Sequence, residues 1–156
     1  MTERTATRRI AASALLLALA GGTGLTAAAQ EDPVTLRPDD PAEVALGARV
    51  YAENCASCHG AELEGEPDWR TRNADGTMPA PPHDETGHTW HHDDATLFRL
   101  TKEGINALLG EGSEVASGMP VFEGVLTDEE IRASLSYIKS TWPGEVRAIH
   151  DDINAR

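Results

Sequence analysis

The sequence predicts an all-α protein, and three observations lead to this fold class. Apolar residues recur at helical spacing in three segments, at about residues 41–54, 93–102 and 127–141. Helix-capping residues stand at or just before the start of these segments. Runs of β-branched residues are few, so no sheet is indicated.

The first 29 residues have the features of an export signal. Arg4, Arg8 and Arg9 precede an apolar run of alanine and leucine, and small residues follow it as far as Ala29. Glycines interrupt the apolar run, whereas a membrane span needs about 20 strongly apolar residues. We therefore expect a signal peptide over residues 1–29 that is cleaved near Ala29; an uncleaved membrane anchor is the alternative.

The chain is strongly acidic, with a net charge of −13 at pH 7. Removal of residues 1–29 takes away three arginines and one glutamate, and the net charge becomes −15. This charge disfavours nucleic acid and anionic membranes and favours basic partners. No second apolar stretch is long enough to span a bilayer. Contact with a membrane is thus expected only through partner complexes or an uncleaved signal.

The first helix follows a polar segment. Residues 30–40 contain prolines and predict a flexible lead-in. Asp40 suits an N-cap and Pro41 suits the first helical position, so a helix is expected from there to about Asn54. Its expected apolar face consists of Val44, Ala45, Ala48 and Tyr51.

A long irregular segment separates the first two helices. Residues 60–90 have no sustained periodicity and are rich in glycine, proline and acidic residues. A structureless stretch of this length is unusual inside a domain, and it is reasonable if the loop surrounds a cofactor. The second helix is expected over 93–102, followed by a helical turn at 105–109 and a glycine-rich loop at 110–118. Its inward-facing residues are expected to be Leu97, Phe98 and Leu100.

The last long helix begins with a capping box. Thr127 and Glu130 have the spacing of that motif, and Pro143 places the end of the helix near Thr141. Residues 143–156 form an acidic C-terminal tail with weaker periodicity, which is either a short helix or disordered. The apolar stripe of the long helix consists of Ile131, Leu135 and Ile138.

The only two cysteines, Cys55 and Cys58, stand in the sequence Cys-Ala-Ser-Cys-His that ends at His59. This spacing is the attachment signature of c-type haem, because two thiols bind one side of the porphyrin and the imidazole then lies below the iron. A zinc site needs further ligands at set spacing, and a redox-active disulfide needs a βαβ context. The motif therefore predicts one haem c per chain, with His59 as an axial ligand.

A sixth ligand to the iron is expected from a methionine, which raises the reduction potential. Met78 and Met119 are the candidates, because Met1 lies in the signal. Met119 follows a glycine-rich loop and precedes a proline and the last long helix. We expect Met119 to be the ligand, while Met78, His88 and His91 remain alternatives.

The region from residue 41 to residue 142 resembles the class I c-type cytochromes, specifically the bacterial mono-haem kind. The resemblance rests on elements in order: the first helix, Cys55 to Gly60, Gly65, Ala80-Pro81-Pro82, Met119-Pro-Val-Phe122, and a helix with Tyr137. It implies a cytochrome c domain over 41–142, with three main helices around one covalently attached haem. It also implies that the first and last of these helices cross at Gly47, Tyr51 and Tyr137.

The resemblance also implies roles for site residues. Pro81 is expected to supply the carbonyl that accepts the Nδ1 proton of His59, with Pro82 or Pro79 as alternatives. With His59 and Met119 as axial ligands, the expected function is one-electron transfer in the periplasm to redox partner proteins, without enzymatic activity. If the sixth ligand leaves easily, a haem peroxidase or a gas or redox sensor is the alternative.

Four histidines, His83, His88, His91 and His92, crowd one short stretch together with Trp90. One interpretation is a second metal site for copper or zinc in a metal-handling protein, since imidazole binds both metals. The other is a polar loop at the haem edge, against which Trp90 packs. The second is favoured, because a metal site demands several ligands in a set geometry. The candidate partners of the haem propionates, or else solvated surface residues, are Arg70, Arg72 and Arg99.

Overall fold

The all-α fold class is confirmed in the computed structural model, which describes residues 34–110 and 112–156 and contains no β-sheet within them. The expected signal peptide, residues 1–29, lies outside the described residues. No helix in the described ranges is long and apolar enough to cross a membrane. The helices are α1 (Pro41–Asn54), α2 (Ala56–His59), the 3-10 helix η1 (Thr89–His91), α3 (Asp94–Glu103), α4 (Ile105–Leu109), α5 (Asp128–Thr141) and α6 (Gly144–Asn154).

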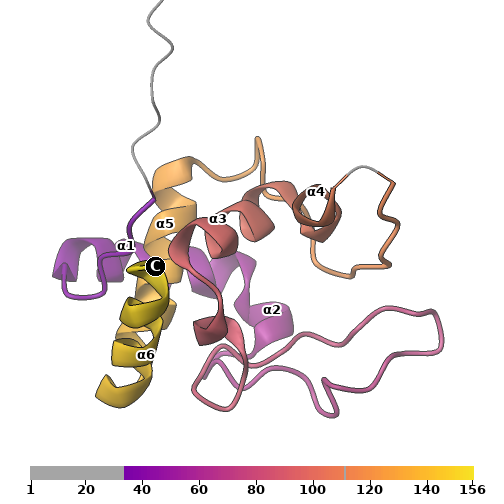
Figure 1. Cartoon of the computed structure of the whole chain (residues 1–156), viewed down its shortest axis with the longest axis horizontal. Coiled ribbons are helices and arrows are strands. Elements are labelled where there is room, and N and C mark those ends of the chain that lie inside the picture. The colour runs from indigo at the N-terminus through magenta and orange to yellow at the C-terminus, as the bar shows by residue number, and fades with distance from the viewer. Residues whose placement is uncertain (1–33, 111) are drawn as a thin grey trace, which may run out of the picture. The chain divides into compact units, whose positions relative to one another are not determined.

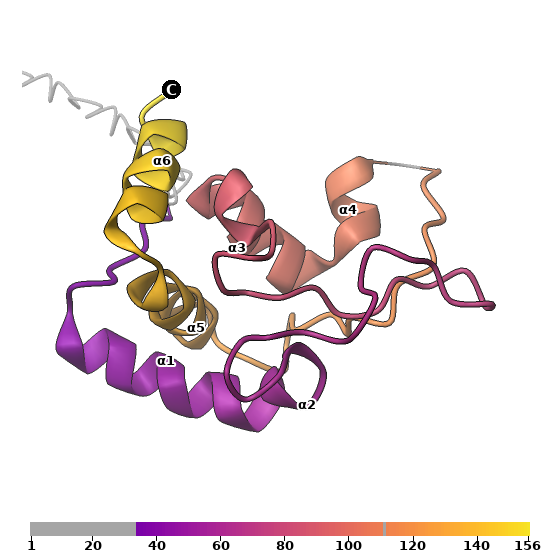
Figure 2. The same cartoon turned by 90° about the horizontal axis from the view of Figure 1, so that it is seen from below.

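Helices α1 and α5 cross in close contact, as Figures 1 and 2 show. A Cβ atom built on Gly47 would overlap the carbonyl oxygen of Ala133 and lie 2.9 Å from the Cβ of Tyr137. The rings of Tyr51 and Tyr137 meet at the same crossing, with their centroids 5.5 Å apart. Only glycine permits this approach of the two backbones, so the crossing expected at Gly47 is confirmed.

The buried face of α1 differs from the expected one. Its buried residues are Glu43, Gly47, Val50 and Tyr51, whereas Ala45 is exposed and Val44 is only half-buried. Residues 43, 47, 50 and 51 share one helical stripe, and the close approach at Gly47 turns this stripe toward α5. The spacing of apolar residues does not reveal this buried stripe, because the stripe contains a glycine and a carboxylate.

The core is built mainly from α5 and the segments around it. Thr127 and Glu130 form the expected capping box, with Oγ1 of Thr127 accepting from the Glu130 backbone N–H and the Glu130 carboxylate accepting from the Thr127 N–H. This confirms the start of the last long helix. The core cluster consists of Leu36, Tyr51, Leu63, Leu97, Phe122, Ile131, Leu135, Ile138, Trp142 and Val146.

The flexible lead-in expected over residues 30–40 is wrong for its described part, residues 34–40. Leu36 is only 5% exposed, and its backbone N–H donates to the Asp94 carboxylate at 2.8 Å. The N–H of Arg37 donates to the hydroxyl of Ser136 at 2.9 Å. One buried leucine and two long-range hydrogen bonds thus hold the segment against α3 and α5, a tertiary effect that local composition does not show.

The acidic tail beyond Pro143 is a helix, α6, so the disordered alternative is excluded. Val146 and His150 are buried, and α6 packs against η1. The ammonium group of Lys139, itself nearly buried, lies 2.6 Å from the Asp151 carboxylate. With 11 residues α6 is shorter than α1 and α5, which have 14 each, and it adds a short fourth helix to the three main helices expected.

The two long loops extend to one side of the described unit, away from α6, in both ribbon views (Figures 1 and 2). One runs from α2 to η1 and the other from α4 to α5. Along the chain α3 lies between these loops, and its N-cap Asp93 and C-cap Gly104 are close to the expected limits.

Candidate haem site

The Cys-x-x-Cys-His motif forms its own short helix, α2, directly after α1. Cys55 is the junction between the two helices; it is half-buried against the core cluster, and Cys58 is exposed. Both thiols are free. Burial, with a contribution from Cys58, raises the pKa of the Cys55 thiol to about 11. Neither cysteine is engaged in a disulfide, so both sulfur atoms are available for covalent attachment.

His59, the last residue of α2, is oriented by a backbone carbonyl. Its Nδ1 lies 2.8 Å from the carbonyl oxygen of Pro81, and the side chain is buried. Burial lowers the pKa of His59, although the hydrogen bond to Pro81 opposes this shift. A carbonyl only accepts, so Nδ1 carries the proton, and in the neutral ring Nε2 keeps its lone pair. This is the tautomer that binds a metal through Nε2.

The position of the Pro81 carbonyl follows from backbone hydrogen bonds that join the segment after α2 to the proline segment. The backbone N–H of His83 donates to the carbonyl of Leu63 at 2.8 Å, and that of Gly65 donates to the carbonyl of His59 at 2.8 Å. Gly65 has a φ of +69°, and a Cβ there would lie 2.7 Å from the carbonyl carbon of Pro81. Glycine therefore allows this turn to pass directly against the proline segment.

A tyrosine closes the other side of the motif. The hydroxyl of Tyr51 donates to the carbonyl oxygen of Gly60 at 2.8 Å. Burial, with a smaller effect from Cys55, raises the pKa of Tyr51, so the phenol stays protonated and keeps donating. The end of α2 is thus tied to the α1–α5 crossing.

The two methionines lie in different surroundings. Met119 is half-buried and packs against the core cluster, whereas Met78 is 38% exposed. The segment after Met119 is fixed to α3, because the Phe122 N–H donates to the carbonyl of Thr101 at 3.3 Å. Of the two, Met119 therefore has the more apolar surroundings.

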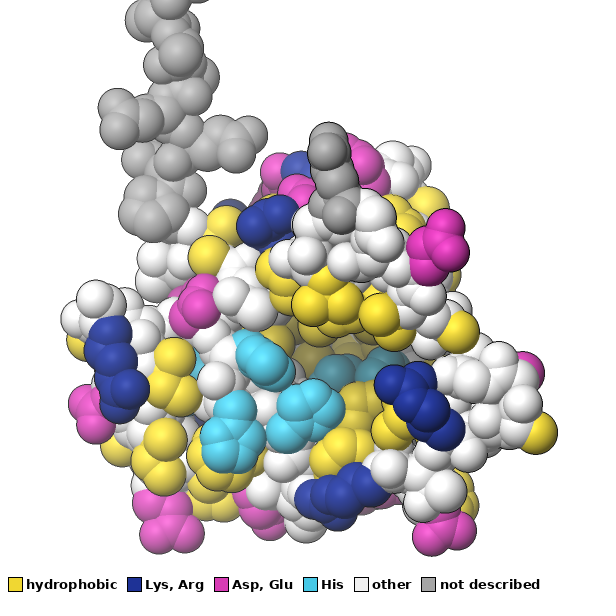
Figure 3. Space-filling model, turned by 45° about the vertical axis from the view of Figure 1, so that its right-hand side comes forward, with side chains coloured by type: hydrophobic (Ala, Val, Ile, Leu, Met, Phe, Trp, Pro, Cys, Tyr) yellow, Lys and Arg dark blue, Asp and Glu magenta, His cyan; other side chains and the backbone are white. Residues whose placement is uncertain are grey.

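A hollow opens on the side to which the two long loops extend. Figure 3 shows hydrophobic side chains lining this hollow and histidine side chains at its rim. An apolar hollow, two free thiols and a histidine with a free Nε2 suit a flat, largely apolar porphyrin that is attached through its edge. The half-buried side chains packed against the core cluster are Cys55, Ala56, Trp90, Phe98, Met119, Leu126 and Tyr137.

The histidine-rich stretch does not form a metal site. Within residues 34–110 and 112–156, no three His, Cys, Asp or Glu side chains are grouped to hold a metal ion. His88 stacks on Trp69 with 5.3 Å between centroids, and His91 stacks on Trp90 with 3.7 Å. His88 and His92 also meet edge to face, with centroids 5.6 Å apart. The described residues therefore offer no support for the metal-handling alternative.

His83 differs from the other histidines, because it lies against His59. The two rings are stacked, with centroids 4.0 Å apart and planes inclined by 22°. The carbonyl oxygen of His83 accepts from Nε1 of Trp142 at 2.8 Å. Burial lowers the pKa of His83 well below its ordinary value, with the nearby His59 adding to the effect. By sequence, His83 belongs to the histidine-rich stretch; its contact with His59 depends on the path of residues 80–84, which bend at His83 and Asp84.

The three arginines considered for the haem propionates have different surroundings. Arg99 lies 3.3 Å from the Glu103 carboxylate on α3. Arg72 donates to the carbonyl of Gly76 at 2.7 Å, within its own loop. Arg70 lies over the ring of Trp69 at 4.0 Å. The structure thus gives both Arg72 and Arg99 a polar partner within their own segments.

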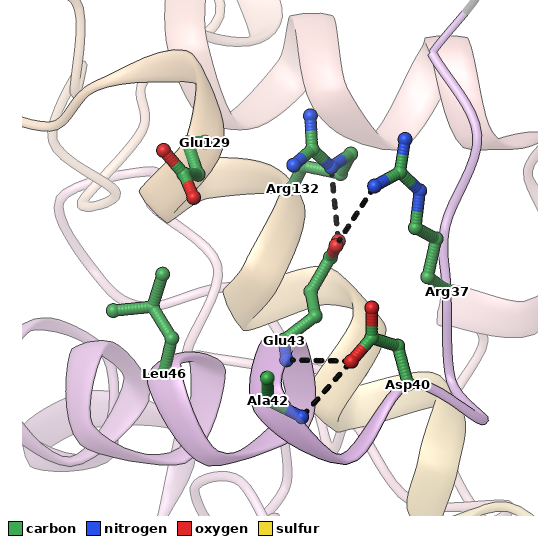
Figure 4. Close-up of a pocket in the computed structure, with 7 residues that line it drawn as sticks. All are labelled: Arg37, Asp40, Ala42, Glu43, Leu46, Glu129 and Arg132. Carbon is green, nitrogen blue, oxygen red and sulfur yellow. Dashed lines mark hydrogen bonds and ion pairs between the residues drawn. The ribbon is translucent and has the colours of Figure 1, made fainter.

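A polar pocket of about 200 Å³ lies where α1 begins and meets α5 (Figure 4). Its central group is the carboxylate of Glu43, which accepts from Nε of Arg132 at 2.9 Å and from the hydroxyl of Ser136 at 3.0 Å. Arg37 lies 3.7 Å from the same carboxylate. These groups satisfy one another, so they stabilise the contact between the two helices.

Comparison with known proteins agrees with this geometry. The Cytochrome c family model matches residues 44–142. The cbb3-type cytochrome c oxidase subunit FixP of Bradyrhizobium sp. (strain ORS 278) is 30% identical over 105 residues, which are 66% of this chain and 29% of that protein. The cbb3-type subunit CcoP of Rhodobacter capsulatus is 29% identical over 111 residues, which are 70% of this chain and 33% of that protein.

The chain spans about a third of the length of these relatives. No solved structure matches it significantly. The family match covers the cysteine motif, the proline segment, Met119 and the crossing of α1 with α5. From the sequence of the motif, the geometry around His59 and this match, the chain belongs to the cytochrome c family of haem-based electron carriers.

Proposed function

We propose that this protein is a periplasmic one-electron carrier with a single haem c, bound through Cys55 and Cys58 and ligated by His59 and Met119. The observation that carries the proposal is the hydrogen bond from Nδ1 of His59 to the Pro81 carbonyl at 2.8 Å. It leaves Nε2 of a buried, neutral imidazole free, next to two free thiols.

Each of these side chains has a separate task. When bound, the haem supplies a one-electron couple at its iron. Pro81 keeps the imidazole of His59 in one tautomer and makes it a better electron donor. The thioether of Met119, in its apolar surroundings, favours the reduced state. Because the chain has only two cysteines, we propose one haem per chain.

The location and the partners follow from other observations. The export-signal features of residues 1–29 support a periplasmic site, where c-type haem is attached. The relatives are named as subunits of cbb3-type oxidases, which supports a membrane respiratory complex as the redox partner. The net charge of −13 supports a basic docking surface on that partner.

Absorption spectroscopy of the matured holoprotein tests the proposal. We expect one covalent haem per chain and, in the ferric state, the long-wavelength band of a methionine–iron bond. Replacing Met119 by alanine is expected to abolish this band and lower the reduction potential. The Met78→Ala variant is the matched control, because Met78 is exposed. It should keep the long-wavelength band and the wild-type reduction potential. Loss of the band in Met78→Ala, or a high-spin ferric wild type, would contradict the proposed ligation.

A further inference from the structure

The ring of His83 covers one face of the ring of His59. The centroids are 4.0 Å apart and the planes are inclined by only 22°. This separation is van der Waals contact between two flat rings. His83 therefore lies against the side chain that the proposed function assigns to the iron, although it belongs to the histidine-rich stretch by sequence.

Three further contacts fix the position of His83. Its Nδ1 lies 2.8 Å from Oγ1 of the buried Thr89. Its backbone N–H donates to the carbonyl of Leu63 at 2.8 Å, and its carbonyl accepts from Nε1 of Trp142 at 2.8 Å. The ring cannot leave His59 without losing the contact with Thr89, and the backbone cannot move without losing contacts to the core. The position of the His83 ring relative to His59 is therefore fixed.

One hydrogen bond does not fully orient an imidazole. The bond to Pro81 fixes the direction of the Nδ1–H vector, but the ring can still tilt about that vector. A flat surface in contact with one face removes this freedom. Groups around a ligand that restrict its orientation also tune the metal, because the plane of an imidazole determines how its orbitals meet those of the iron.

We propose that His83 is a positioning residue for His59: its stacked ring sets the plane of the imidazole ligand, while Pro81 sets its tautomer. The inference rests on the proposed function, in which His59 is an axial ligand. It predicts that the shape and flatness of residue 83 matter for the electronic structure of the haem, beyond any effect on folding.

Three variants of the ferric holoprotein test this inference, read by the haem-methyl shifts in proton NMR and the g values in EPR. His83→Leu keeps the volume but removes the flat ring and should change the order and spread of the methyl shifts. His83→Phe keeps a flat ring and should retain the wild-type order. Thr89→Val leaves His83 without its 2.8 Å partner and should broaden the EPR signal. The control His88→Leu should match wild type, because His88 stacks on Trp69.

Wild-type shifts and g values in both His83→Leu and Thr89→Val, with only the midpoint of thermal unfolding lowered, would overturn the inference and leave His83 a packing residue. If His83→Leu does not fold, Thr89→Val alone decides. Failure of the proposed function is recognised separately: the wild type would then lack covalent haem, or His59→Ala would keep the wild-type spectrum. Variants are compared only at wild-type haem content, so the two failures stay distinct.

Discussion

At His59, one hydrogen bond determines which ring nitrogen is free to bind iron. The acceptor is a backbone carbonyl, Pro81, so the bond does not depend on the protonation of a second side chain. What positions that carbonyl is Gly65, whose backbone passes against Pro81 and Pro82 with a φ of +69°. The chemistry of the site thus depends on a glycine that touches neither ring nitrogen.

The Gly65→Ala variant tests this dependence. Its Cβ would lie 2.5 Å from the backbone nitrogen of Pro82, so the proline segment has to move and the bond from His59 to Pro81 has to lengthen. We expect a loss of about 1–3 kcal/mol in the free energy of unfolding. We also expect a higher reduction potential, because His59 then donates less electron density. Chemical denaturation and a redox titration of the holoprotein measure the two effects.

Gly76→Ala is the matched control for this experiment. Gly76 also has a positive φ, +87°, but nothing lies within 4 Å of the Cβ position. Its substitution adds only backbone strain, which should lower stability slightly and leave the potential unchanged. A shift of the potential in Gly76→Ala equal to that in Gly65→Ala would refute a specific role for Gly65.

Helix α6 is attached to the rest of the domain through buried polar groups. His150 is fully buried, and its Nε2 lies 3.5 Å from Oδ1 of Asp94. Within the described part of the chain, neither of these two atoms has a hydrogen-bond partner. The charged groups around His150 are Asp94 on α3, Lys139 on α5 and Asp151 on α6. The attachment of α6 is therefore sensitive to the protonation of His150.

Acidification is expected to weaken the attachment of α6. Burial lowers the pKa of His150 and the charge of Lys139 lowers it further, while Asp94 opposes the shift. Because the folded-state pKa lies below the unfolded value, the unfolded chain binds more protons between the two. His150 therefore contributes stability that is complete above a pH of about 6.5 and is lost as the pH falls toward the folded-state pKa.

The His150→Gln variant measures this contribution. Denaturation followed by circular dichroism at pH values of about 7.5 and about 5.5 should show a smaller loss of stability on acidification in the variant than in the wild type. His91→Gln, which replaces an exposed histidine, is the control and should keep the wild-type difference. An unchanged pH dependence in His150→Gln would show that other groups cause the acid sensitivity.

The strongly negative net charge, −13 for the whole chain and −15 without residues 1–29, governs its encounters rather than its fold. A negative carrier and a basic partner attract one another over a distance that salt shortens, from about 30 Å at 0.01 M to about 10 Å at 0.1 M ionic strength. We expect the second-order rate of electron transfer to a basic redox protein to fall as salt increases over this range. Stopped-flow mixing measures it, with an uncharged small oxidant as control. A rate that is flat or rises with salt would exclude electrostatic steering.

Much of the molecule follows from local sequence patterns. Asp40-Pro41, the Thr127–Glu130 capping box and Gly104 mark helix ends that are visible without any tertiary contact, because caps satisfy backbone groups of their own helix. The haem motif is equally local, since its chemistry requires the two thiols and the imidazole within five residues. Fold class and family were therefore predictable.

Other features were decided only by the tertiary structure. Leu36 is ordered because its backbone N–H reaches Asp94. His83 lies on His59 because residues 80–84, which bend at His83 and Asp84, pair with Leu63. Trp142, 59 residues from His83 along the chain, holds that bend in place. Such contacts join segments far apart in sequence and leave no periodic pattern. The sequence by itself thus determined the helices and the haem motif, while packing of distant segments decided how the imidazole of His59 is oriented.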